Sequence, residues 1–237
     1  MNIIPATVRQ RVHVANGYDW TRSAATDFWV VFSPEAHDAT AGNANNLAEA
    51  GWTLTSMVQT AGSGHDFLAT DAAYAPPHFL TDAASDLVQS PAIFGTHAHG
   101  KIFESIMGYF PTQLVLETYA AMTVASNNET ITTLGGFVEI GGSPIVANDA
   151  QLMLFSDGTN FGLRSGAATD AGAAVDTAWH LWKVVMTVGS TAEWFIDGTS
   201  QGTVAIQADL APYSYGFGVG AASSNRPGVA WTHIYYR

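Results

Sequence analysis

One stretch near the C-terminus, residues 179–206 (WHLWKVVMTVGSTAEWFIDGTSQGTVAI), constrains the fold more than any other. Apolar and other side chains alternate over residues 181–187 and again over residues 192–196. Such alternation is typical of β-strands, in which successive side chains point to opposite faces of a sheet. The next pair, Asp197-Gly198, favours a type I′ turn, because that turn needs positive φ at both central positions. The segment therefore predicts three antiparallel strands joined by two tight turns.

Similar patterns fill most of the chain after residue 100. We expect strands at residues 101–109, 113–124, 129–140, 150–155, 161–164, 180–188, 191–196, 203–206, 213–219 and 229–236. Two earlier strands are expected at residues 27–32 and 52–58. Short strands at this spacing, with turn signals between them, predict an all-β antiparallel sandwich.

The N-terminal part of the chain is less regular. Residues 1–20 have the character of an extended arm, and residues 60–96 that of a long irregular loop. Within that loop we expect a short helix over residues 82–89, with Thr81 as its N-cap. The prediction is therefore a single domain over residues 21–237, preceded by the arm.

The order of features in residues 179–206 (Trp, strand, short turn, aromatic strand, Asp-Gly, strand) resembles the second half of concanavalin A-like lectin/glucanase jelly rolls, which include laminin-G-like domains. The resemblance covers residues 101–237 well and residues 27–60 poorly. It implies a jelly-roll sandwich with one concave sheet. It also implies a function in glycan binding or in building surfaces, and some relatives cleave polysaccharides.

Charge and composition exclude several classes of function. Eight Lys and Arg stand against twenty Asp and Glu, which gives a formal net charge of −12. Such a field repels nucleic acid and anionic membrane surfaces, and no basic stripe offsets it. The chain has no cysteine, hence no disulfide or thiolate metal site. We expect no signal peptide, because Arg9 and Arg11 lie where its apolar core would be, and no apolar run long enough to span a membrane.

The alternation also separates two faces on each strand, and one face carries aromatic and acidic side chains together. The candidate glycan-binding residues are Glu117, Tyr119, Phe137, Glu139, Glu193, Phe195, Trp231, His233 and Tyr235. Aromatic faces pack against the C–H groups of sugar rings, and carboxylates accept hydrogen bonds from sugar hydroxyls. We therefore expect these residues to line a glycan groove. The alternative is that the rings belong to the core and that the three Glu are solvated.

Catalytic motifs are missing from the sequence. Laminarinase-like jelly rolls carry a Glu-x-Asp-x-x-Glu pattern, and alginate-lyase-like ones carry an Arg-rich strand and a Gln-x-His motif; we find none of these. A Gly-x-Ser-x-Gly nucleophile elbow is absent as well. We expect a protein that is not an enzyme, with a polysaccharide hydrolase or lyase as an alternative.

Metal binding has only weak candidates. His97 and His99, with Glu104 nearby, could hold zinc, although no further ligand is specified. Acidic and amide residues in turns leave calcium as an alternative; these are Asp157, Asn160, Asp197 and the segment 127–129. Because Asp and Asn in turns usually bond their own backbone, we expect no cofactor.

Charged residues make up only 12% of the chain, against about 25% in typical soluble domains. A weakly charged surface suits a subunit that packs against neighbours. Our leading hypothesis is a structural or decorating surface subunit of a larger assembly, such as a phage virion, that contacts copies of itself and possesses a glycan-binding face. It would be cytoplasmic before assembly and then lie on the virion or another extracellular assembly. A stand-alone lectin module is the alternative.

Overall fold

The computed structural model describes residues 12–13, 27–31, 53–55, 79–80, 87–94, 113–122, 132–139, 150–187, 190–206, 213–219 and 227–236. Within these ranges the chain forms fifteen strands and no helix. The described residues therefore include no helix long and apolar enough to cross a membrane.

Eight strands form what we call the front sheet. Their order is β1-β2-β15-β6-β11-β12-β13, with β4 paired to β15 as well. Their bounds are β1 Val12–His13, β2 Asp27–Val31, β4 Phe79–Leu80, β6 Gln113–Met122, β11 His180–Thr187, β12 Thr191–Ile196, β13 Thr199–Ala205 and β15 Pro227–Tyr236. Every pair is antiparallel except β1 with β2, which is parallel.

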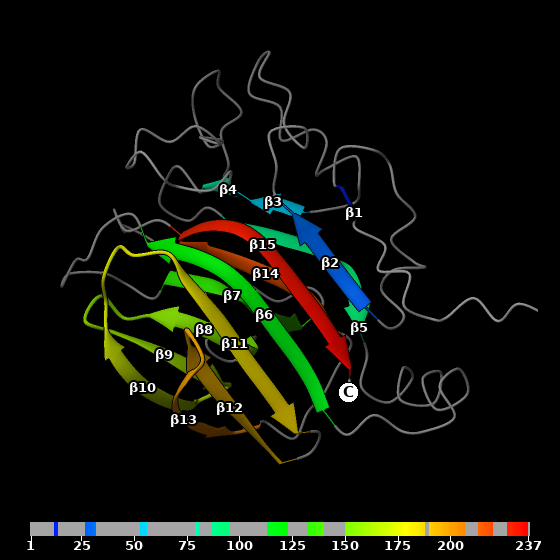
Figure 1. The fold of residues 1–237 in the computed structure, drawn as a ribbon. Coiled ribbons are helices and arrows are strands. Elements are labelled where there is room, and N and C mark those ends of the chain that lie inside the picture. The colour runs from blue at the N-terminus through cyan, green and yellow to red at the C-terminus, as the bar shows by residue number, and fades with distance from the viewer. Residues whose placement is uncertain are drawn as a thin grey trace, which may run out of the picture.

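Seven strands form the back sheet, in the order β10-β9-β8-β7-β14-β5-β3. Their bounds are β3 Thr53–Thr55, β5 Leu87–Phe94, β7 Thr132–Glu139, β8 Ala150–Ser156, β9 Asn160–Ser165, β10 Ala168–Ala174 and β14 Tyr213–Val219. All pairs in this sheet are antiparallel. The two sheets stack face to face (Figure 1), which confirms the predicted antiparallel sandwich.

The core lies between the sheets and is dominated by large rings. Trp182 and Trp194 of the front sheet are completely buried. The ring of Phe161, from the back sheet, packs edge-on against Trp182 at 4.7 Å between centroids. Each indole N–H has a partner: Trp182 donates to the carbonyl of Ala120 at 3.0 Å, and Trp194 donates to a carboxylate oxygen of Asp170 at 2.7 Å. Buried rings with satisfied polar atoms add apolar area without an unpaired donor.

Residues 179–206 fold as the sequence predicts. β11, β12 and β13 form a consecutive antiparallel meander. Between β12 and β13, Asp197 and Gly198 both adopt positive φ, at 50° and 82°. This is the backbone conformation that a type I′ turn requires and that Asp-Gly tolerates. The prediction of three strands and an Asp-Gly turn is therefore confirmed.

One local prediction is wrong, and two others lie outside the described residues. The helix expected over residues 82–89 is replaced, from Leu87 onward, by strand β5, which pairs with β14 and β3 and buries Val88. Pairing within a sheet outweighs a local capping signal. β10 was not predicted, because its residues are mostly Ala, Gly, Thr and Asp, which have weak strand preference. The strand expected at 101–109 and most of the arm at 1–20 fall outside the described part of the chain.

Candidate functional site

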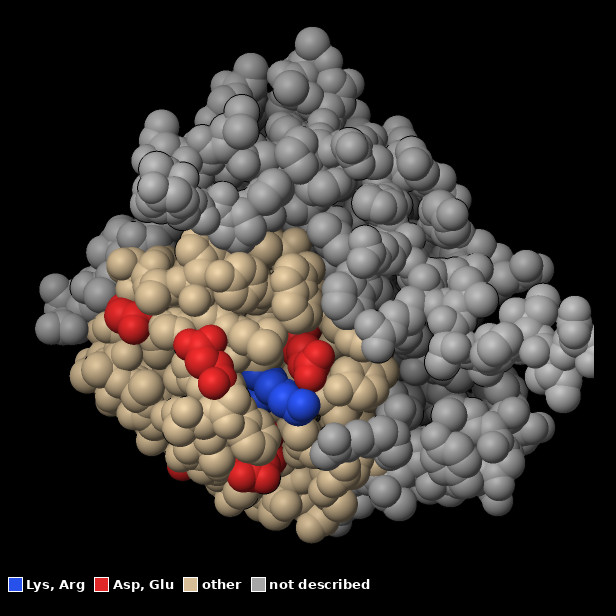
Figure 2. Space-filling view, in the orientation of Figure 1, with Lys and Arg blue, Asp and Glu red and all other residues tan. Residues whose placement is uncertain are grey.

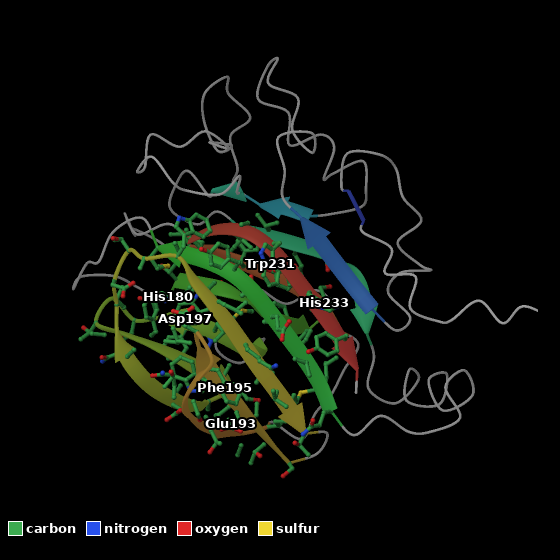
Figure 3. All side chains as sticks on the ribbon, in the orientation of Figure 1. His180, Glu193, Phe195, Asp197, Trp231 and His233 are labelled. Atoms are coloured by element: carbon green, nitrogen blue, oxygen red, sulfur yellow. The ribbon has the colours of Figure 1, made fainter. Side chains whose placement is uncertain are left out.

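The outer face of the front sheet brings together side chains from four neighbouring strands. Because alternate residues of β6 and β11 fill the core, the residues between them point outward. The register aligns them in three rows: Trp231, Tyr119 and Leu181; then His233, Glu117, Lys183 and Phe195; then Tyr235, Val115, Val185 and Glu193. We call this set the outer face. Figure 3 shows its labelled members on β15 (Trp231 and His233) and on β12 (Glu193 and Phe195).

Glu117 lies at the centre of the outer face and joins three strands. Its Oε1 atom is 3.1 Å from the Nζ atom of Lys183 on β11. The same oxygen accepts a hydrogen bond from the hydroxyl of Tyr235 on β15, at 3.3 Å. On the other side, Nδ1 of His233 lies 3.9 Å from Oε2, and the rings of His233 and Tyr235 stack at 4.5 Å. These contacts follow from the register: Lys183 and His233 lie directly opposite Glu117 on the neighbouring strands, and Tyr235 lies diagonal to it, within reach of a long side chain.

The surroundings of Glu117 keep its carboxyl group ionised. The interaction with His233 is the largest influence on its pKa, burial opposes it, and the ammonium of Lys183 adds to it; together they lower the pKa to about 2. The side chain is still 23% exposed. Glu117 is therefore an anionic hydrogen-bond acceptor at neutral pH that a ligand from solvent can reach.

Beside Glu117, three aromatic rings form what we call the aromatic cluster: Tyr119, Trp179 and Trp231. The rings of Tyr119 and Trp231 lie 6.3 Å apart with planes inclined by 25°. Tyr119 also contacts Trp179, which directly precedes β11, at 5.4 Å. All three rings are only half-buried. We did not predict Trp179 as a site residue, although its place just before an alternating strand was a usable signal.

A second polar cluster lies at the turn end of the same face (Figure 3) and was also missed. Nδ1 of His180 is 2.6 Å from a carboxylate oxygen of Asp197, and Nε2 is 3.0 Å from one of Asp176. The other oxygen of Asp197 accepts a hydrogen bond from the backbone N–H of Leu181. Burial works to lower the pKa of His180, but the hydrogen bonds to the two carboxylates outweigh it and raise the pKa. The imidazole thus connects the β12–β13 turn, through Asp197, to the segment before β11, through Asp176.

Phe137 does not belong to the outer face, and this corrects our prediction. It lies on β7 of the back sheet, is only 1% exposed and belongs to the hydrophobic core. Glu139 ends the same strand of the back sheet, and its side chain is outside the described set. The spacing of a Glu two residues from an aromatic predicts a shared face, but it does not say which sheet, or which face of it, the pair occupies.

The predicted metal ligands do not converge in the described part of the chain. Asp157 accepts hydrogen bonds from the backbone N–H groups of Thr159 and Asn160, both at 2.8 Å, which is an ordinary Asx turn. No group of three or more His, Asp or Glu suited to a metal occurs among the described residues. His97, His99, Glu104 and residues 127–129 lie outside them.

Comparison with known proteins supports the fold and goes no further. No family model and no curated protein matches the chain. Among solved structures, a protein named sialidase superimposes with a TM-score of 0.52 at 10% identity, over 89% of this chain and 18% of that one. The binding domain of botulinum neurotoxin DC, in complex with rat synaptotagmin II, gives 0.47 at 8% identity over 69% of this chain and 40% of that one. The same domain in complex with SialylT gives equal values. This chain spans less than half the length of each, and at such identities the sialidase likeness shows a shared sandwich fold.

Proposed function

We propose that this protein binds carbohydrate on the outer face of its front sheet. The observation that carries the proposal is the position of the half-buried aromatic cluster directly beside the ionised carboxylate of Glu117. Ring faces and edges offer surface to the C–H groups of a pyranose, while the carboxylate and the hydroxyl of Tyr235 offer hydrogen-bond partners to its hydroxyls. Apolar surface with a few placed polar groups is the usual make-up of a small-molecule site.

We propose binding without bond cleavage. A general acid in a glycosidase needs a raised pKa, whereas the pKa of Glu117 is lowered to about 2. The other outer-face carboxylate, Glu193, is on β12, with β11 between the two strands. Glu193 is also offset by two residues from the position opposite Glu117, so two strand spacings and this offset place the two backbones roughly 12 Å apart. The paired carboxyl groups of glycosidases lie about 5–9.5 Å apart. Glu193 also accepts a hydrogen bond from Ser200 at 2.7 Å. These features favour an acceptor role for both carboxylates.

A glycan array followed by titration calorimetry tests the proposal. We expect the wild-type protein to bind a defined subset of glycans, and we expect Trp231→Ala and Tyr119→Ala each to weaken that binding at least tenfold. Loss of a stacking ring removes contact area with the sugar. Thr169→Ala is a matched control, because Thr169 is an exposed position on β10 of the back sheet. A wild-type protein that binds no glycan, or ring variants that bind as the wild type does, would refute a glycan site here.

We propose, as a second function, that this module belongs to a larger assembly, of which a virion surface is one example. The supporting observation is the low share of charged residues, 12%. Size-exclusion chromatography with light scattering provides the test: a subunit of an assembly should form a defined oligomer, whereas a stand-alone lectin module should elute as a monomer. A subunit of an assembly can also bind glycans, so the result of one measurement does not decide the other.

A further inference from the structure

The charges on and around the outer face are mostly negative. Besides Glu117, the face has Glu193, and at its turn end Asp176 and Asp197 are more than half exposed. One Lys, Lys183, lies among them, and Figure 2 shows a blue side chain flanked by red ones on this side of the molecule. The only other cationic Lys or Arg among the described residues is Arg164, which is buried on β9 of the back sheet.

The ammonium of Lys183 and the imidazole of His180 already have acidic partners. Lys183 lies 3.1 Å from Glu117 and is opposite it in the strand register. His180 lies between Asp176 and Asp197, within 3.0 Å of both. A ligand carboxylate would therefore have to displace an existing ion pair, and it would then meet the carboxylate that the displaced cation had neutralised.

The acidic groups, in contrast, have acceptor capacity left for neutral donors. A carboxylate has about four lone-pair positions, and among the described residues Glu193 accepts a side-chain hydrogen bond from the hydroxyl of Ser200. The bond from Tyr235 to Glu117 is long, at 3.3 Å, so a sugar hydroxyl that approaches Glu117 can replace it at little cost. Hydroxyl donors fit this arrangement, and anions do not.

We propose that the outer face selects uncharged saccharides and rejects acidic ones, such as sialylated glycans or uronic-acid polymers. This inference rests on the glycan-binding function proposed above and specifies its ligand class. Selectivity here comes from repulsion by Glu117, Glu193 and the two Asp at the turn, in addition to attraction by the rings.

An array of matched pairs tests this inference: each neutral oligosaccharide is printed beside the same core with a sialic acid or a uronic acid at its end. In every pair with a member that binds, we expect the protein to bind the neutral member with at least tenfold higher affinity than the acidic member at low salt. The preference should shrink at high salt, because salt screens exposed charges. The variant Glu193→Gln keeps the size of the side chain and an oxygen that accepts the hydrogen bond from Ser200, but it removes one negative charge. The ratio of affinities between neutral and acidic members should therefore be smaller for this variant than for the wild type.

The outcomes separate this inference from the function on which it rests. Binding of neutral members alone, with a salt-sensitive preference, supports both. Equal or tighter binding of acidic members, with the dependence on Trp231 retained, overturns the charge selectivity and leaves the glycan site standing. Binding to neither member of any pair rejects the site itself, and the selectivity with it.

Discussion

The inner and outer faces of the front sheet are made of alternate residues of the same strands, yet they use their side chains differently. On β11, Trp182 and Val184 are buried in the core, while Lys183 between them is 32% exposed and paired with Glu117. On β6, Leu116 packs inward and Glu117 points outward. The inner side chains contact residues of the back sheet, whereas the described polar contacts of the outer ones are with neighbouring strands of their own sheet.

This difference separates stability from recognition. An inner residue holds two sheets together, so its loss leaves a cavity that the sandwich cannot fill. Glu117 and Lys183 on the outer face pair laterally and are 23% and 32% exposed, so the loss of either leaves a group that solvent can satisfy. We therefore expect inner substitutions to have the larger effect on the free energy of unfolding, and outer ones to act mainly on ligand binding and on the pH dependence of stability.

The largest effect is expected for Trp182→Ala. The substitution removes a completely buried ring, its edge contact with Phe161 and its hydrogen bond to the carbonyl of Ala120. Loss of a core aromatic costs about 3–5 kcal/mol of unfolding free energy. Urea denaturation followed by fluorescence and circular dichroism measures this loss.

Trp231→Ala is the matched control, because it removes the same type of side chain from the outer face of the same sheet. Its half-buried ring should contribute less than half as much to the free energy of unfolding. Equal destabilisation by the two substitutions would contradict the separation of the two faces.

The fold could be predicted largely from the sequence because its signals are local. The alternation in β6 and β11 and the Asp197-Gly198 turn depend only on residues a few positions apart, so both can be recognised from the sequence alone. β5 could not be predicted, because its strand structure comes from pairing with β14, which lies far along the chain. β10 could not be predicted either, because its own residues are weak strand-formers and its structure comes from pairing with β9. Local propensity does not contain that information.

The site could be predicted only strand by strand. Alternation placed Tyr119, Glu117 and Lys183 on definite faces of their own strands, but only the register shows that Glu117 lies between Lys183 and His233. The same limitation explains the error with Phe137, whose strand belongs to the other sheet. The pairing of His180 with Asp176 and Asp197 joins the two ends of a hairpin, and a pattern of single residues does not reveal it.

A smaller effect is expected for Glu117→Gln and should depend on pH. The folded-state pKa of Glu117 is lowered from 4.5 to about 2. Its ionised form therefore stabilises the fold fully above about pH 5, and this contribution is lost as the pH falls toward 2. Because solvent screens part of the interaction, we expect the variant to have a free energy of unfolding roughly 2 kcal/mol lower than that of the wild type at neutral pH. This difference should disappear at acidic pH. Urea denaturation at a series of pH values measures the gap, and a gap that is constant with pH would contradict this role of the charge.

The smallest effect is expected for His180→Gln, and its pH dependence has the opposite direction. Hydrogen bonds to Asp197 and Asp176 outweigh burial and raise the pKa of His180 above 6.5. The protonated imidazole therefore stabilises the fold below pH 6.5, and this contribution disappears as the pH rises through the raised value. Because both Asp partners are more than half exposed, we expect at most about 1 kcal/mol, reduced further by high salt. Thermal unfolding of both proteins between mildly acidic and mildly alkaline pH measures it. A gap that widens as the pH rises would show that the neutral imidazole, and not its charge, connects the turn to β11.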